Sequence, residues 1–156
     1  MEEIVNLHAL NEPTGLSGDK KLGRLHGRVK DLVDDLLSRT GPAAVEDEIN
    51  AEIDKVNGVP DSRKELKKGF QTAYSRITQI ALKRLNLVPK GYYRTMWMSI
   101  GLGAFGVPIG VSIGVVLDNM GFIGVGLPLG MVIGMAVGSA MDKRAAEEGR
   151  QLSIEE

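Results

Sequence analysis

Glycine recurs at every fourth position in two apolar segments, and this spacing constrains the fold of the chain more than any other feature. The first series is Gly106, Gly110 and Gly114, and the second is Gly126, Gly130, Gly134 and Gly138. Residues four apart share one face of an α-helix, so each series leaves a stripe that carries no side chains. Two helix backbones can approach closely along such stripes. The sequence therefore predicts a tightly packed pair of helices.

Both segments are also long and apolar enough to cross a membrane. Asp, Glu, Lys and Arg are absent from 95 to 117 and again from 120 to 141. About 20 apolar residues, rising roughly 1.5 Å each, cross the roughly 30 Å hydrocarbon core of a bilayer. We expect transmembrane helices over about 95–117 and 120–141, joined by a short turn at Asp118 and Asn119. Residues 91–142 would form this hairpin.

An antiparallel hairpin suggests a register for the two glycine series. One alignment about Met120 places all three glycines of the first segment opposite glycines of the second. The predicted pairs are Gly106 with Gly134, Gly110 with Gly130 and Gly114 with Gly126, and Leu102 would then face Gly138. The alternative is that the glycines contact lipid or other subunits.

Each segment carries a second distinctive face. Pro108 and Pro128 lie two residues from a glycine of the series, about 200° around the helix, so they point away from the glycine stripe. Ser112 and Ser139 join these proline faces. An isolated pair of helices does not need such faces. We therefore expect the hairpin to assemble into homo-oligomers.

Residues at the ends of the segments predict an orientation. Aromatic rings favour the headgroup boundary, and basic residues favour the cytoplasmic side. Aromatic and basic residues gather at the outer ends of the segments, while the turn has no Lys or Arg: Tyr92, Tyr93, Arg94 and Trp97 at the first, Lys143 and Arg144 at the second. We expect a multi-pass protein of the cytoplasmic (inner) membrane, with both termini in the cytoplasm and the turn outside.

The preceding part of the chain has the pattern of a small helical domain. Residues 1–18 are predicted to be a flexible or docked arm, 19–90 a soluble domain of about three helices, and 143–156 a charged cytoplasmic tail. The helices are expected over about 19–39, 42–57 and 61–86, each with apolar residues at helical spacing. Ser17 or Asp19 can cap the first helix, Pro42 can open the second and Asp61 can cap the third. The whole chain is predicted to be all-α.

Charge is distributed unevenly along this domain. Residues 41–59 carry a net charge of −4, whereas residues 60–90 carry +6. We expect the two charged faces to attract each other across the helices. Contact of the basic face with anionic lipid headgroups is the alternative. Only Phe70 and Tyr74 lie among the bases, both on the apolar stripe of the predicted helix, and there is no groove-reading motif, which argues against nucleic acid.

Signatures of catalysis are not found in the sequence. His8 and His26 lack the spaced partners of a metal site, and His26 is expected at the surface or at the edge of the helices. The GxGxxG pattern at 101–106 falls inside an uncharged segment, where a dinucleotide has no entry. We expect no cofactor, no metal and no enzymatic activity.

The stretch from Met96 to Leu152 resembles small bacterial membrane proteins of the glycine-zipper type. The resemblance rests on the paired apolar segments and on the motif that runs from Gly138-Ser-Ala-Met-Asp142 to Gly149-Arg-Gln-Leu152. It covers about a third of the chain and leaves the N-terminal helices unmatched. It implies a close-packed hairpin that often forms oligomers, and it transfers no active residues.

These features favour an oligomeric channel or membrane-permeabilising effector that is controlled by its cytoplasmic domain. Asp118 would then form a ring at the mouth of the pore, or it would simply solvate the turn. Two other functions fit the same features. One is a non-conducting anchor that presents the helical domain to an unidentified protein partner, and the other is an accessory subunit of a larger membrane complex.

Overall fold

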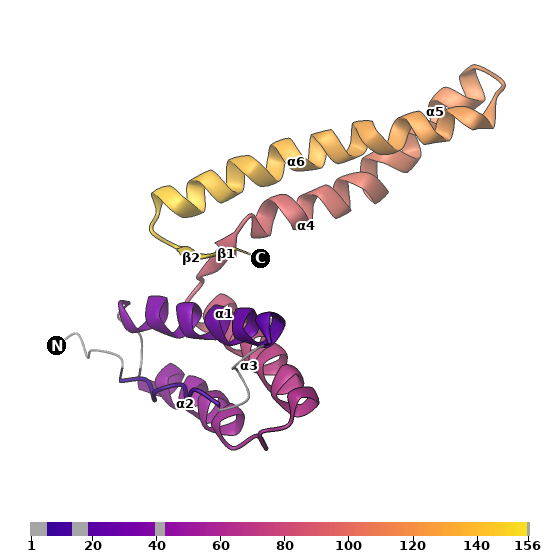
Figure 1. The fold of residues 1–156 in the computed structure, drawn as a ribbon. Helices are drawn as coiled ribbons and strands as arrows, with labels where there is room; N and C mark the ends of the chain where they lie inside the picture. Colours follow the sequence, from indigo (N-terminus) through magenta and orange to yellow (C-terminus); the bar gives the residue numbers. More distant parts are fainter. Residues whose placement is uncertain (1–5, 14–18, 40–42, 156) are drawn as a thin grey trace. The chain divides into compact units, whose positions relative to one another are not determined.

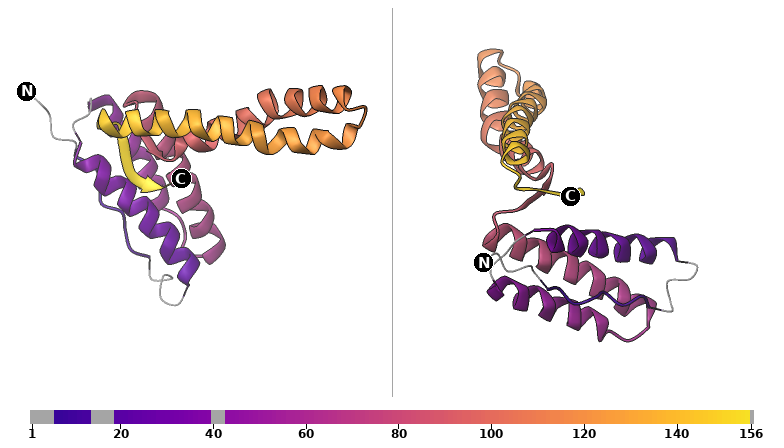
Figure 2. Two further views of the ribbon diagram at one scale, coloured as in Figure 1. Left: turned by 90° about the horizontal axis from the view of Figure 1, so that it is seen from above. Right: turned by 90° about the vertical axis from the view of Figure 1, so that its left-hand side faces the viewer.

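The computed structural model describes residues 6–13, 19–39 and 43–155, which are mostly helical, as predicted. The chain divides into two compact units. The first comprises residues 1–88 together with 152–154, and we call it the helical unit. The second comprises residues 89–151 and the last two residues, and we call it the hairpin unit (Figures 1 and 2).

Three helices build the helical unit: α1 (Lys20–Leu37), α2 (Ala43–Asn57) and α3 (Arg63–Arg84). Asp19 caps α1 as predicted, because its carboxylate accepts hydrogen bonds from two N–H groups of the first turn. The N-cap of α3 is Ser62 and not the predicted Asp61. The predicted roles of Ser17 and Pro42 fall on residues outside the described ranges.

Apolar faces of the three helices form the core of the helical unit. Both α1 and α2 pack against α3. The largest fully buried side chains include Leu32 and Leu36 of α1, Ile49 and Ile53 of α2, and Phe70 and Ile77 of α3. These residues lie on the stripes that helical spacing predicts, since positions three and four apart share a face.

The sequence predicted His26 at the surface or at the edge of the helices, and the surface position is wrong, because the residue is buried. Its side chain is 7% exposed, and its ring meets the edge of Phe70 at 5.4 Å between ring centroids. Its Nε2 atom is 3.2 Å from the carbonyl oxygen of Asn11. A partner for the ring nitrogen explains how a histidine is accommodated there, since buried polar groups need hydrogen bonds.

The hairpin unit consists of two long antiparallel helical stretches (Figure 1). The first contains α4 (Tyr92–Gly101), a π-helical turn η2 (Leu102–Gly106) and α5 (Val107–Val116). The second contains the short 3-10 turn η3 (Met120–Phe122) and α6 (Ile123–Glu147). The stretches Tyr92–Val116 and Met120–Glu147 are long and apolar enough to cross a membrane, with mean hydropathies of 1.9 and 2.0 in their most apolar windows.

Two short strands, β1 (Val88–Lys90) and β2 (Gln151–Glu155), pair in a two-stranded sheet. Leu152 and Ile154 of β2 are buried in the core of the helical unit. The Asp35 carboxylate on α1 accepts hydrogen bonds of 3.1 Å from both the backbone N–H and the hydroxyl of Ser153. The segment predicted as a charged tail thus has two parts. Its first residues continue α6, which ends at Glu147. Its later residues Leu152 and Ile154 belong to the core of the helical unit.

Candidate functional site

Glycines bring the two long stretches of the hairpin unit into backbone contact. Four glycines of α6 are buried, namely Gly126, Gly130, Gly134 and Gly138. A Cβ atom added at any of these four would come closer than 3.0 Å to backbone atoms of the other stretch, and Gly101 and Gly110 are equally confined. Carbonyl oxygens of the first stretch lie beside the four α6 glycines, those of Tyr93, Trp97, Gly101 and Gly106 facing Gly138, Gly134, Gly130 and Gly126 in turn. We call these residues the glycine contact face.

The register of this face differs from the predicted one by about one helical turn. Gly106 lies beside Gly126 and Gly130 and not beside Gly134, while Gly134 lies beside Trp97. The prediction placed Leu102 on the face, but Gly101 is buried there and Leu102 is only half-buried.

The shift is already present near the turn between the two stretches, where Gly110 lies beside Gly126 and not beside Gly130. The π-helical turn explains why Gly101, and not Leu102, lies on the face. The carbonyls that face the α6 glycines are spaced four, four and then five residues apart, and the five-residue step from Gly101 to Gly106 spans η2. A π-helical turn adds one residue to a helix, which moves Gly101 onto the face. The turn ends two residues before Pro108, which has no N–H to donate. Local π adjustments are one way in which apolar helices accommodate proline.

Asp142 of α6 caps the N-terminus of α4 at one end of the glycine contact face. Its two carboxylate oxygens accept hydrogen bonds of 3.0 Å from the backbone N–H groups of Tyr93 and Arg94. These N–H groups belong to the first turn of α4, where no helical partner exists. A carboxylate at a helix N-terminus also interacts favourably with the helix dipole. Asp142 lies one turn beyond Gly138, and this spacing is the signal in the sequence that could have predicted the cap.

The proline faces point outward from the hairpin unit. Pro108, Ser112, Pro128 and Ser139 are all exposed. The hydroxyl of Ser112 donates to the carbonyl oxygen of Pro108 at 2.8 Å, and Ser99 bonds in the same way to Thr95 at 3.2 Å. These two hydroxyls are thus satisfied within their own helix and need neither water nor a second chain.

The predicted boundary residues are distributed around the ends of the hairpin unit. The rings of Tyr92 and Tyr93 meet edge to face, with centroids 5.3 Å apart. The indole Nε1 of Trp97 is enclosed and has no hydrogen-bond partner among the described residues. The basic residues Arg94, Lys143 and Arg144 are exposed. At the opposite end Asp118 is exposed and adopts a left-handed conformation with φ of 48°, which aspartate tolerates in turns.

The charged faces of α2 and α3 meet at their edges. Arg84 of α3 pairs with Glu48 of α2, with 2.8 Å between nitrogen and oxygen. This pair agrees with the expected attraction between the two faces. Both side chains are at least 40% exposed, so the pair contributes little stability, about 0–1 kcal/mol.

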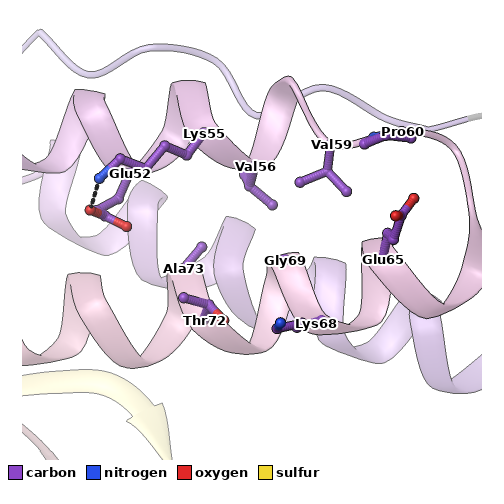
Figure 3. A pocket seen from close by; sticks show the side chains of 10 residues that line it. All are labelled: Glu52, Lys55, Val56, Val59, Pro60, Glu65, Lys68, Gly69, Thr72 and Ala73. Carbon is purple, nitrogen blue, oxygen red and sulfur yellow. Dashed lines mark hydrogen bonds and ion pairs between the residues drawn. The ribbon is translucent and has the colours of Figure 1, made fainter.

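A hollow of about 350 Å³ lies between α2 and α3 (Figure 3). Its floor is apolar, with Val56, Val59 and Ala73, and its rim carries Glu52, Lys55, Glu65 and Lys68. Gly69 sits opposite Val59 and keeps the two helices close, since an added Cβ would lie 3.0 Å from the Val59 side chain. The hollow has the form of a shallow apolar groove and holds no cluster of reactive groups.

A second group of functional candidates, which the sequence did not predict, surrounds the N-terminal residues 6–13. This segment runs between α1 and α2 (Figure 2). Asn50 and Asn57 of α2 bond to its backbone, and His8 pairs with Asp54 at 2.8 Å. Two asparagines seven apart with an aspartate between them were the available signal.

Among the described residues no group of three or more His, Cys, Asp or Glu side chains could hold a metal ion. The chain matches no family model, no curated protein and no solved structure.

Proposed function

We propose that this chain is an integral membrane anchor that holds its helical unit at the surface of a bilayer. The outward direction of the apolar side chains carries the proposal. In the most apolar windows of the two long stretches, only 22% and 17% of the residues are buried within the protein. Core helices of water-soluble proteins have most of these residues buried, whereas lipid is a suitable surrounding for exposed apolar side chains.

Chain connectivity supports a hairpin that crosses the bilayer twice. The chain leaves the helical unit at Val88 and returns to it at Leu152. Two crossings bring the chain back to the side from which it started. The basic residues on either side of the hairpin favour the cytoplasm for that side.

Flotation tests the anchor. The protein, reconstituted into liposomes, should float with the vesicles and should resist extraction by alkaline carbonate. The natural chain has no cysteine, so single cysteines at Asn119 and Glu148 report the topology cleanly. Asn119→Cys should react with an impermeant maleimide in intact cells and Glu148→Cys should not. Release by carbonate, or equal labelling of both sites, contradicts the proposal.

An oligomeric channel is the second candidate function. The exposed proline faces favour it, because small side chains at Ala104 and Ser112 allow close contact between neighbouring hairpins. Copies of Asp118 would then gather in a ring that attracts cations. Against conduction, the glycine contact face is occupied within one hairpin, and the hydroxyls of Ser99 and Ser112 bond to their own helices.

Leakage of a dye and of ions from liposomes separates the two functions. An anchor leaves vesicles sealed although inserted protein is present. A channel releases ions, and Asp118→Asn lowers its preference for cations. The oligomeric state in detergent, measured by light scattering, tests the expected homo-oligomer independently of conduction.

A further inference from the structure

The N-terminal segment of residues 6–13 lies in a groove whose floor is α3 and whose walls are α1 and α2. Both wall helices pack on α3, and the segment lies between them (Figure 2). We call residues 6–13 the arm. It belongs to none of the helices or strands, and most of its residues are exposed.

Two asparagines of α2 recognise the backbone of the arm. The Asn50 side chain accepts from the N–H of His8 at 2.7 Å and donates to the carbonyl of Asn6 at 3.1 Å. The Asn57 side chain repeats this three residues later. It accepts from the N–H of Asn11 at 2.9 Å and donates to the carbonyl of Ala9 at 2.9 Å.

The two helical positions match the repeat of an extended chain. Seven residues of an α-helix advance about 10.5 Å. Three residues of an extended or polyproline-like chain advance about 10 Å. Each amide therefore meets the same pair of backbone groups at successive repeats. Backbone groups are common to all sequences, so this part of the recognition does not depend on the arm's side chains.

Side chains at every third position of the arm supply the sequence-dependent part. Leu7 is buried in the core, Leu10 packs against it, and Pro13 is half-buried, whereas the residues between them are exposed. A period of three is typical of a polyproline-like segment that places one face against a groove. The groove thus selects apolar side chains at three positions spaced by three.

The arm fills the third of these positions poorly. A cavity of about 230 Å³ remains beside Asn11 and Pro13. Val56, Val59, Leu66 and Phe70 form its apolar side, and Asn57 and Asp61 form its polar side. A larger apolar side chain at the position of Pro13 would fill the cavity and contact the apolar side.

We infer that the groove between α1 and α2 binds an extended segment of a partner protein that carries three apolar side chains at intervals of three, the third one larger than proline. The arm is then a built-in competitor that occupies the groove when the partner is absent. This inference rests on the proposed anchor, for which it names the surface that receives the partner.

Competition explains why the occupant is a partner with better contacts and not the arm of a second copy. A tethered segment has an effective concentration of about millimolar, so an identical arm from another copy gains nothing over the resident one. A segment that also fills the cavity has an advantage that can overcome the tether. Most residues of the arm are exposed and lie outside helices and strands, as expected of a part that opens more readily than the core.

Peptide binding to the full-length protein in detergent tests the inference. Leu7→Asp should release the arm, and fluorescence anisotropy then measures two labelled peptides. One has the sequence of residues 6–13, and the other has Phe in place of Pro13. Both should bind the released variant, the Phe peptide about tenfold more tightly. Wild-type protein should bind both at least tenfold more weakly.

Substitutions in the groove complete the test. Asn57→Ala, added to Leu7→Asp, should weaken both peptides about tenfold, whereas the matched control Asn119→Ala should not. Circular dichroism verifies folding, and Leu10→Asp replaces Leu7→Asp if that variant unfolds. A folded, arm-released protein that binds both peptides no better than a scrambled one overturns the inference.

Two further outcomes also overturn it. In the first, the two peptides bind with equal affinity, which would show that the groove does not select a larger apolar side chain at its third position. In the second, wild-type protein at equal concentration displaces the Phe peptide from the arm-released variant. The groove would then bind the arm of a second copy and not a partner protein. Neither outcome affects flotation or labelling, so the proposed anchor stands or falls separately.

Discussion

The helical unit and the hairpin unit solve the packing problem in opposite ways. In the helical unit the fully buried positions carry large side chains such as Phe70, Leu32 and Ile77. In the hairpin unit the buried positions are almost all glycine, while Val115, Val116 and Val132 point outward with 62%, 81% and 63% exposure. The helical unit packs large side chains against one another, whereas the hairpin unit packs backbone against backbone at positions that have no side chain.

This difference teaches which force each unit uses. Burying apolar side chains away from water stabilises the helical unit. Lipid is as apolar as leucine, so the hairpin of the proposed anchor gains little from burying side chains and relies on close backbone contact. Cα–H groups that face carbonyl oxygens add about 0.5–1 kcal/mol each. Removing volume should therefore damage the first unit, and adding volume should damage the second.

The largest effect is expected for Phe70→Ala. Loss of this ring leaves a cavity at the centre of the helical unit and should lower its free energy of unfolding by about 3–5 kcal/mol. Urea unfolding followed by circular dichroism measures the change. Leu37→Ala is the matched control on α1, because Leu37 is 38% exposed and should shift stability by less than about 1 kcal/mol.

Adding volume to the hairpin should have the next largest effect. Gly130→Leu forces the two stretches apart and should cost about 3 kcal/mol. Gly101→Leu should be equally damaging, because the π-helical turn places Gly101 on the contact face. Gly124→Leu is the control, since an added Cβ there meets nothing within 4 Å. Titration with SDS measures all three, and equal tolerance at the three positions would refute the contact face.

Asp142→Ala tests whether a polar contact matters where glycines dominate. It leaves two N–H groups of α4 without their acceptor and should cost about 1–2 kcal/mol. The same SDS titration gives the value. Glu147→Ala, on the same helix with a side chain 65% exposed, should change little. A loss at Glu147 as large as at Asp142 would argue against the cap.

The smallest effect concerns acidity in the helical unit. Burial alone would raise the pKa of Asp19, but donation from Leu22, Arg63 and Lys21 lowers it below its ordinary value of 3.8. A lowered pKa stabilises the folded state above the ordinary value, and this stability is lost as the pH falls through the folded pKa.

Stability of the helical unit should therefore drop below about pH 4 in the wild type and less so in Asp19→Asn. Urea midpoints at several pH values measure the difference between the two proteins. Asp47→Asn serves as the control on α2. A difference that is constant from pH 7 to pH 2 would show that the cap does not depend on the charge.

Periodicity was enough to predict the helices of both units. The apolar residues at helical spacing in α2 are all buried, namely Val45, Ile49, Ile53 and Val56. The glycine spacing likewise identified the faces that meet. Both predictions depend only on residues close in sequence, whose relative positions are set by helix geometry.

Contacts between distant residues could not be predicted in this way. The hairpin register is one turn away from the predicted one, and a single π-helical residue brings Gly101 in place of Leu102 onto the contact face. The apolar sequence reveals neither feature. Bonds from Asn50 to the arm, and from Asp35 to Ser153, join positions 42 and 118 residues apart. Leu152 and Ile154 are two apolar residues in a charged stretch, and only the shape of the core shows where they belong.

The burial of Leu152 and Ile154 has a consequence for synthesis. These side chains complete the core of the helical unit, yet the ribosome makes them only after both apolar stretches. Domains usually fold in the order in which they emerge from the ribosome, which synthesises about 5–20 residues per second. In the proposed anchor, this unit waits with part of its core open while the hairpin is inserted. Failed insertion of that anchor would leave the helical unit incomplete and accessible to chaperones and proteases.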